Sequence, residues 1–144
     1  EPLKFVVPAD HRLAGKAQVS PSQLRGEKVL TLEEQHHFHH QVQEICHRLG
    51  AIIQRDYEGT SLDTLRQMVV MGLGVAFLPG LYVHSEMHHP EAIHVSELRG
   101  RPVLRQHGLV WRATAPRRNF YREMAAHMRE IIRARLGSVV SVID

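Results

Sequence analysis

Residues 59–79, GTSLDTLRQMVVMGLGVAFLP, constrain the fold more than any other part of the chain. Thr60 or Ser61 is suited to cap a helix, because a side-chain oxygen there accepts a hydrogen bond from an unpaired backbone N–H. Apolar residues then recur at helical spacing, at Leu62, Leu65, Met68 and Val69. A glycine-rich turn follows at 72–74, and the apolar run 75–78 is typical of a strand covered on both faces. The segment therefore predicts a helix followed by a buried strand of an open sheet.

The rest of the chain continues this alternation of strands and helices. The pattern predicts strands at residues 3–7, 29–32, 52–57, 75–78, 93–95 and 109–111. It predicts helical segments at residues 21–24, 36–49, 62–71, 80–82 and 117–135, with a loop around 88–90. Alternation of this kind indicates an α/β fold, with a mostly parallel sheet and helices on both faces.

Composition sets wider limits. The 144 residues can bury one sizeable core, and 43% hydrophobic with 23% charged residues is ordinary for a soluble domain. No apolar stretch approaches the roughly 18 residues needed to span a bilayer, and the chain does not begin with a signal peptide. We therefore expect no membrane partner and a cytoplasmic location. The single cysteine, Cys46, cannot form a disulfide within the chain, which fits a reducing compartment.

The last predicted helix, residues 117–135, is amphipathic and basic. Its apolar stripe consists of Phe120, Met124, Met128 and Ile131, and most of its arginines lie off that stripe. One interpretation is a helix that binds nucleic acid, and the other is a surface helix with a solvated basic face. We favour the surface helix, because Glu123 and Glu130 interrupt the basic patch.

The central segment carries a family likeness. Its characteristic residues are Thr60, Ser61, Leu62, Leu65, Arg66, Met68, Val69, Gly72, Gly74, Leu78 and Pro79. Residues 1–13, 26–32 and 108–112 support the likeness on both sides. In the order and spacing of these segments the chain resembles the effector-binding domain of LysR-type transcriptional regulators, and most closely their OxyR-like branch.

The resemblance implies a fold and a division of the chain. Such domains are periplasmic-binding-protein-like, with two flavodoxin-like lobes joined by two crossing strands and an effector pocket between the lobes. By this template the chain is a fragment of a two-lobe domain that begins, at Glu1 rather than Met, at the first crossing strand. Residues 1–107 form the second lobe, and residues 108–144 provide the return strand and terminal helix of the first. The DNA-binding domain is absent, and the stripe of the terminal helix lacks its usual sheet partner, which favours self-association.

The resemblance also implies a function. We expect an effector- or redox-sensing regulatory domain that responds to a small molecule or an oxidant and forms a homodimer or homotetramer. DNA would be bound through the absent N-terminal domain. The alternatives are a stand-alone protein that binds small anions and a histidine-rich, metal-responsive module. We expect no enzyme and no cofactor, because the sequence contains no nucleophile elbow and no phosphate-binding glycine loop.

The histidine-rich helix, residues 36–49, offers weak metal candidates. Its apolar residues Phe38, Val42, Ile45 and Leu49 share one face. His36, His40 and His47 lie on the opposite face with Glu44, and imidazoles on successive turns can bind Zn²⁺. We favour an exposed polar face without metal, because a surface away from the core needs ligands from elsewhere to close a tetrahedral site.

The same helix holds the redox candidates Cys46, His37 and His39. In the OxyR-like branch a reactive cysteine occupies the position of His37, and Cys46 matches the position of the resolving cysteine. An imidazole cannot perform thiolate chemistry, so a two-cysteine switch cannot operate within this chain. Cys46 is then either a structural residue beside His39 or a one-cysteine sensor that is oxidised to sulfenic acid, with His39 lowering its pKa.

Thr60 and Ser61 are the candidate effector-binding residues. Backbone N–H groups and the dipole at a helix start favour an anion, and a carboxylate is the simplest ligand for them. Effector pockets of the family use a loop and helix start of this kind. Plain helix capping explains the same two residues equally well.

Overall fold

The computed structural model describes residues 1–87 and 92–143, so the predicted loop at 88–90 lies outside the described residues. The elements are β1 (Leu3–Pro8), β2 (Gln18–Val19), the 3-10 helix η1 (Pro21–Leu24), β3 (Lys28–Leu32), α1 (His37–Leu49), β4 (Ile52–Gly59), α2 (Leu62–Val70), β5 (Val75–Pro79), α3 (Gly80–Glu86), β6 (Ile93–Leu98) and α4 (Arg118–Leu136). The predicted α/β alternation is confirmed, with boundaries shifted by a few residues and with the short strand β2 added.

The sheet is mixed. Its strand order is β2-β6-β1-β5-β3-β4. β3 runs parallel to β4 and β5, and β2 runs parallel to β6, whereas β1 is antiparallel to both of its neighbours, β5 and β6. From β3 the chain crosses to β4 in one direction and returns past β3 to β5 in the other. Because such crossovers are right-handed, they place α1 and α2 on opposite faces of the sheet.

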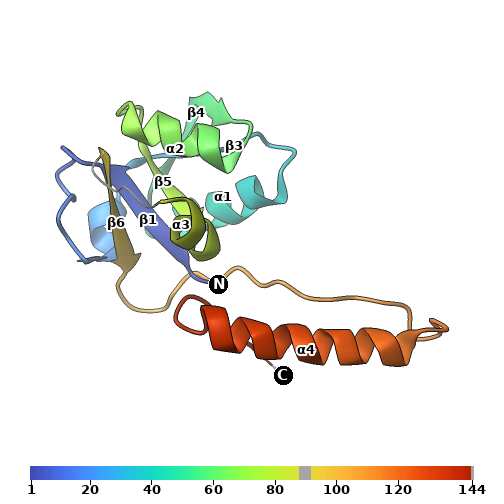
Figure 1. Cartoon of the computed structure of the whole chain (residues 1–144). Helices are drawn as coiled ribbons and strands as arrows, with labels where there is room; N and C mark the ends of the chain where they lie inside the picture. The colour runs from blue at the N-terminus through green and yellow to red at the C-terminus, as the bar shows by residue number, and fades with distance from the viewer. Residues whose placement is uncertain (88–91, 144) are drawn as a thin grey trace.

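Strands β1, β5 and β3 are neighbours in the sheet (Figure 1). Buried side chains along these strands form the centre of the core. Every residue of β5 is buried, and only Lys28 at the start of β3 is exposed, as expected for strands covered on both faces. The rings of Phe5 and Phe77 pack with centroids 5.4 Å apart. α1 contributes Phe38, Val42, Ile45 and Cys46, and α2 contributes Leu65 and Val69. The predicted apolar faces of both helices are confirmed.

The turn between α2 and β5 needs its glycines for different reasons. Gly72 has φ +75°, a left-handed conformation that side chains with a Cβ rarely adopt. At Gly74, a Cβ would lie 2.8 Å from the carbonyl oxygen of Lys28. The backbone directly before β5 therefore approaches β3 more closely than a residue with a Cβ permits.

α4 lies apart from the sheet, joined to it by an extended connector (Figure 1). The predicted strand at 109–111 is wrong, because these residues pair with no strand of the described chain. Ala125 is the buried residue of α4, whereas the stripe Phe120, Met124, Met128 and Ile131 is 40% to 58% exposed. The stripe is thus uncovered, as expected. None of the described helices combines the length and apolar character needed to cross a bilayer.

Candidate functional site

The predicted effector-binding residues form the start of α2. Ser61 is the N-cap, and its Oγ accepts a hydrogen bond from the backbone N–H of Thr64 at 3.1 Å. The hydroxyl of Thr60 lies 3.4 Å from that of Thr64. Both Thr60 and Ser61 are exposed. Capping therefore occupies the Ser61 oxygen, and the binding of an anion at this helix start stays a prediction.

A polar contact that the sequence did not predict joins α2 to α3. Tyr82 donates a hydrogen bond from its hydroxyl to Oδ1 of Asp63 at 2.6 Å. Burial, reinforced by the hydrogen bond to Asp63, raises the pKa of Tyr82. Asp63, in the first turn of α2, therefore has a tertiary partner on α3.

The redox candidates lie on α1 in contrasting environments. Cys46 is 2% exposed, and burial raises its pKa from 9.0 to about 12, because a thiolate is poorly solvated in the core. His39 is also buried, and its Nδ1 lies 2.8 Å from the carbonyl oxygen of Leu32. His37 is exposed at the first position of the helix. The burial of Cys46 opposes thiolate chemistry and favours its structural role.

The weak metal candidates are not drawn into a cluster. His36 is the N-cap of α1, and His40 and His47 are exposed on its outer face. Within residues 1–87 and 92–143, no three His, Cys, Asp or Glu side chains form a group that could hold a metal ion. The predicted polar face thus presents its histidines to solvent, and the metal-responsive alternative is not favoured.

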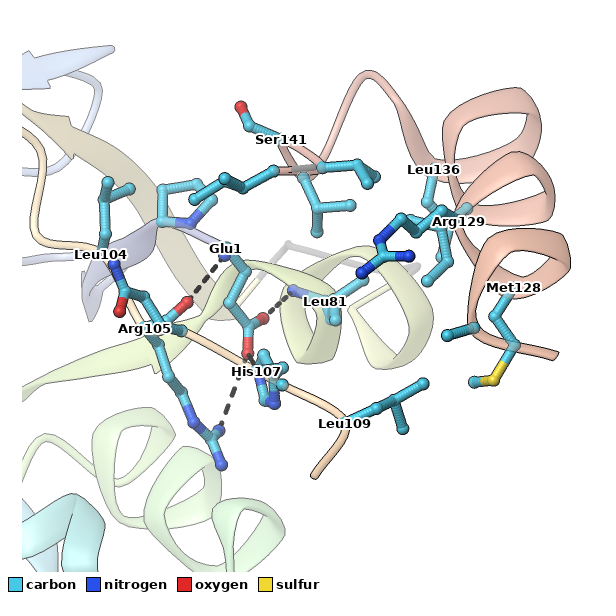
Figure 2. Close-up of a pocket in the computed structure, with 18 residues that line it drawn as sticks. Glu1, Leu81, Leu104, Arg105, His107, Leu109, Met128, Arg129, Leu136 and Ser141 are labelled. Atoms are coloured by element: carbon cyan, nitrogen blue, oxygen red, sulfur yellow. Dashed lines mark hydrogen bonds and ion pairs between the residues drawn. The ribbon is translucent and has the colours of Figure 1, made fainter. Parts of the chain in front are cut away.

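A cavity of about 470 Å³ lies where the connector to α4 passes the chain start (Figure 2). Its walls come from the chain start, α3, the connector, α4 and the tail beyond α4. Its polar groups include Glu1, Arg105, His107 and Arg129, set among apolar side chains such as Leu81, Leu109 and Leu136. Thr60, Ser61 and Cys46 do not line it, so this cavity is separate from every predicted site residue.

The carboxylate of Glu1 is the most constrained charge at this cavity. Its side chain is only 2% exposed. Oε2 accepts a hydrogen bond from the backbone N–H of Leu81 at 2.8 Å, and Oε1 lies 2.5 Å from Nε2 of His107 and 3.8 Å from Nη1 of Arg105. Figure 2 shows Glu1 between these three partners. A buried carboxylate requires such compensation, and these three partners supply it.

Sequence patterns did not predict this arrangement. The partners are separated by 80 residues in one case and by 106 in another, and no periodicity links such distant positions. The available signal was a charged residue two positions before a buried strand, together with an arginine and a histidine at 105 and 107, just before the residues GLVWR. Neither feature indicates a partner by itself.

The chain has a mixed α/β fold whose beginning and end run side by side, and comparison with known proteins assigns its family. The chain belongs to the LysR substrate binding domain family, whose profile matches residues 1–133. Among curated relatives, the DNA-binding transcriptional dual regulator OxyR of Escherichia coli K12 is 35% identical over 136 residues. That alignment covers 94% of this chain but 43% of the relative, so the chain spans less than half of the relative's length.

Solved structures show the same similarity in three dimensions. The reduced OxyR regulatory domain of Pseudomonas aeruginosa superposes with a TM-score of 0.73 at 34% identity, covering 90% of this chain and 62% of that one. The oxidised form of OxyR superposes with a TM-score of 0.76 at 32% identity, covering 92% and 62%. The fold is therefore periplasmic-binding-protein-like, with the mixed sheet described above.

Proposed function

We propose that this chain belongs to the effector- or redox-sensing regulatory domain of a LysR-type, DNA-binding transcriptional regulator. The observation that carries the proposal is the family match over residues 1–133, joined to 35% identity with a relative named as a DNA-binding transcriptional regulator. The activity is regulatory rather than enzymatic, and it takes place in the cytoplasm, where the DNA is.

Within that domain, residues 1–107 are the second lobe and residues 108–144 contribute a connector and a terminal helix to the first. Two observations support this division. The sheet and its helices bury one core among residues 3–103, whereas α4 contributes no residue to that core. The uncovered stripe of α4 also presents the kind of apolar face that packs against a sheet. A first lobe outside this chain would supply that sheet.

The signal is a small molecule or an oxidant that shifts the population of domain arrangements. Cys46 is buried and His37 replaces the reactive cysteine, so we favour a small-molecule effector that binds in the cleft between the lobes. The helix start at Thr60 and Ser61 supports an anionic effector, because the backbone N–H groups there favour negative charge. One-cysteine oxidation of Cys46 with help from His39 is the second candidate.

We also propose a homodimer or homotetramer. β4 is an edge strand, and it exposes the large apolar side chains of Ile52 (56%) and Tyr57 (43%). Exposed edges with apolar residues favour pairing with another chain. DNA would be held by a part of the protein outside this chain.

A mobility-shift assay tests where DNA binding resides. The full-length parent protein should retard a fragment of the promoter that it regulates, and residues 1–144 alone should not, because Glu123 and Glu130 interrupt the basic face of α4. Retardation by residues 1–144 at the same concentrations would instead make α4 a nucleic-acid-binding helix. A parent without sequence-specific binding would favour the stand-alone anion-binding protein.

A further inference from the structure

The two ends of the lobe are joined by a short antiparallel ladder. We name residues 103–107 the crossing segment. The N–H of Leu3 donates to the carbonyl oxygen of Val103 at 2.8 Å, and the N–H of Arg105 donates to the carbonyl oxygen of Glu1, also at 2.8 Å. Pro2 and Leu104 form an antiparallel bridge between these bonds. Any movement of the crossing segment must therefore act on the start of β1.

One side of the crossing segment is held by the Glu1 carboxylate. This group lies between His107 and Arg105 and also accepts the N–H of Leu81 in the first turn of α3. Because the carboxylate is 2% exposed, the loss of one partner leaves a buried charge poorly compensated. The crossing segment and the start of α3 are thus joined by a single side chain.

The other side of the crossing segment is held by the start of α1. The guanidinium carbon of Arg105 lies 5.8 Å from the centre of the Phe38 ring, within the range of a cation–π contact. Nε2 of Gln41, one turn further along α1, donates to the carbonyl oxygen of Leu104 at 3.2 Å. Arg105 is therefore the residue that contacts both Phe38 of α1 and the carboxylate of Glu1.

We propose that Arg105 is a positioning residue that couples the first turn of α1 to the first turn of α3 through Glu1. If Phe38 moves, Arg105 loses the ring that supports it, the carboxylate loses a cation, and the acceptor of the Leu81 N–H is no longer held in place. The coupling is a property of this chain alone. Its use in regulation, to carry a change at the start of α1 to the crossing of the lobes, depends on the function proposed above.

Amide hydrogen exchange in residues 1–144, measured by NMR, tests the coupling without DNA or effector. The two reporters are the N–H of Leu81, which donates to Glu1, and the N–H of His39, which donates to the carbonyl oxygen of His36 at the start of α1. Arg105→Met should speed the exchange of both reporters by about three- to tenfold. Arg101→Met, at an exposed arginine just before the crossing segment, is the matched control and should change neither.

Single changes at each end test transmission. Glu1→Gln should speed exchange at the N–H of His39, and Phe38→Leu should speed exchange at the N–H of Leu81. Both distant effects should vanish in the Arg105→Met background.

Phe38 is 7% exposed, so its replacement can destabilise the whole chain. Arg105→Lys is therefore the second variant, because it keeps a cation near Glu1 and removes the flat guanidinium from the ring. Changes that stay confined to the mutated end would overturn the proposal.

Discussion

At the scale of single residues, burial decides what the chemistry-bearing side chains can do. Cys46 and the Glu1 carboxylate are each 2% exposed, but only the carboxylate has a partner of opposite charge, the guanidinium of Arg105. The thiol avoids the cost of an unpaired buried charge by staying protonated, so its pKa rises to about 12. A residue that matches a resolving cysteine by position thus has the environment of a core residue.

We expect the Cys46 thiol to react slowly with a thiol reagent in the folded chain. Its pKa of about 12, compared with 9.0 for an ordinary cysteine, leaves a thiolate fraction near neutral pH that is roughly a thousandfold smaller. Labelling with an aromatic disulfide reagent, followed by absorbance, should be at least about a hundredfold slower in buffer than in urea. Equal rates would instead support Cys46 as a one-cysteine sensor.

The same shift fixes a pH dependence. Above pH 9 the thiol of the unfolded chain loses its proton, whereas the folded chain keeps it until about pH 12. The stability contributed by the buried neutral thiol is therefore fully present below pH 9 and is lost as the pH rises toward 12. In Cys46→Ala, the free energy of unfolding should therefore fall less between pH 9 and pH 12 than in the natural sequence.

At the scale of elements, sequence patterns correctly predicted the helices, turns and strands that depend on contacts within one short segment. The capped helix α2, its glycine turn and the strand β5 were predicted from residues 59–79, because the cap, the apolar period and the turn lie within one short segment. The direction of β1 was not, because antiparallel pairing with β5 and β6 depends on how distant segments meet. Residues 109–111 have the composition of a strand, but a strand needs a neighbour, and the described chain provides none there.

The uncovered stripe of α4 should make the 144-residue chain self-associate. Burying a large apolar side chain contributes about 1.5–3 kcal/mol, so Phe120→Glu combined with Ile131→Glu should weaken association more than about tenfold. Sedimentation velocity over a range of concentrations measures the change. Val110→Glu is the control, because Val110 is 94% exposed on the connector and off the helix. If the control and the double variant behave alike, α4 is not the associating surface.

At the scale of the whole molecule, the predicted class was correct and the contacts at the chain start were beyond sequence reasoning. The family likeness was based on segments spread over most of the chain. The assignment therefore did not depend on the predicted strand at 109–111, which was wrong. The Glu1 carboxylate with Arg105 and His107 depends on the meeting of the two chain ends, which no local pattern records. The cavity of about 470 Å³ beside it likewise arises from five separate segments.

We propose that the full-length protein senses its signal without a two-cysteine switch in this chain. The most direct test is a DNA footprint of the full-length parent protein, with and without hydrogen peroxide, for the natural sequence and for Cys46→Ser. Because Cys46 is buried and its pKa is raised, we predict that peroxide leaves the footprint unchanged and that Cys46→Ser gives the same footprint. A footprint that changes with peroxide in the natural sequence and not in Cys46→Ser would contradict the account and make Cys46 the sensor.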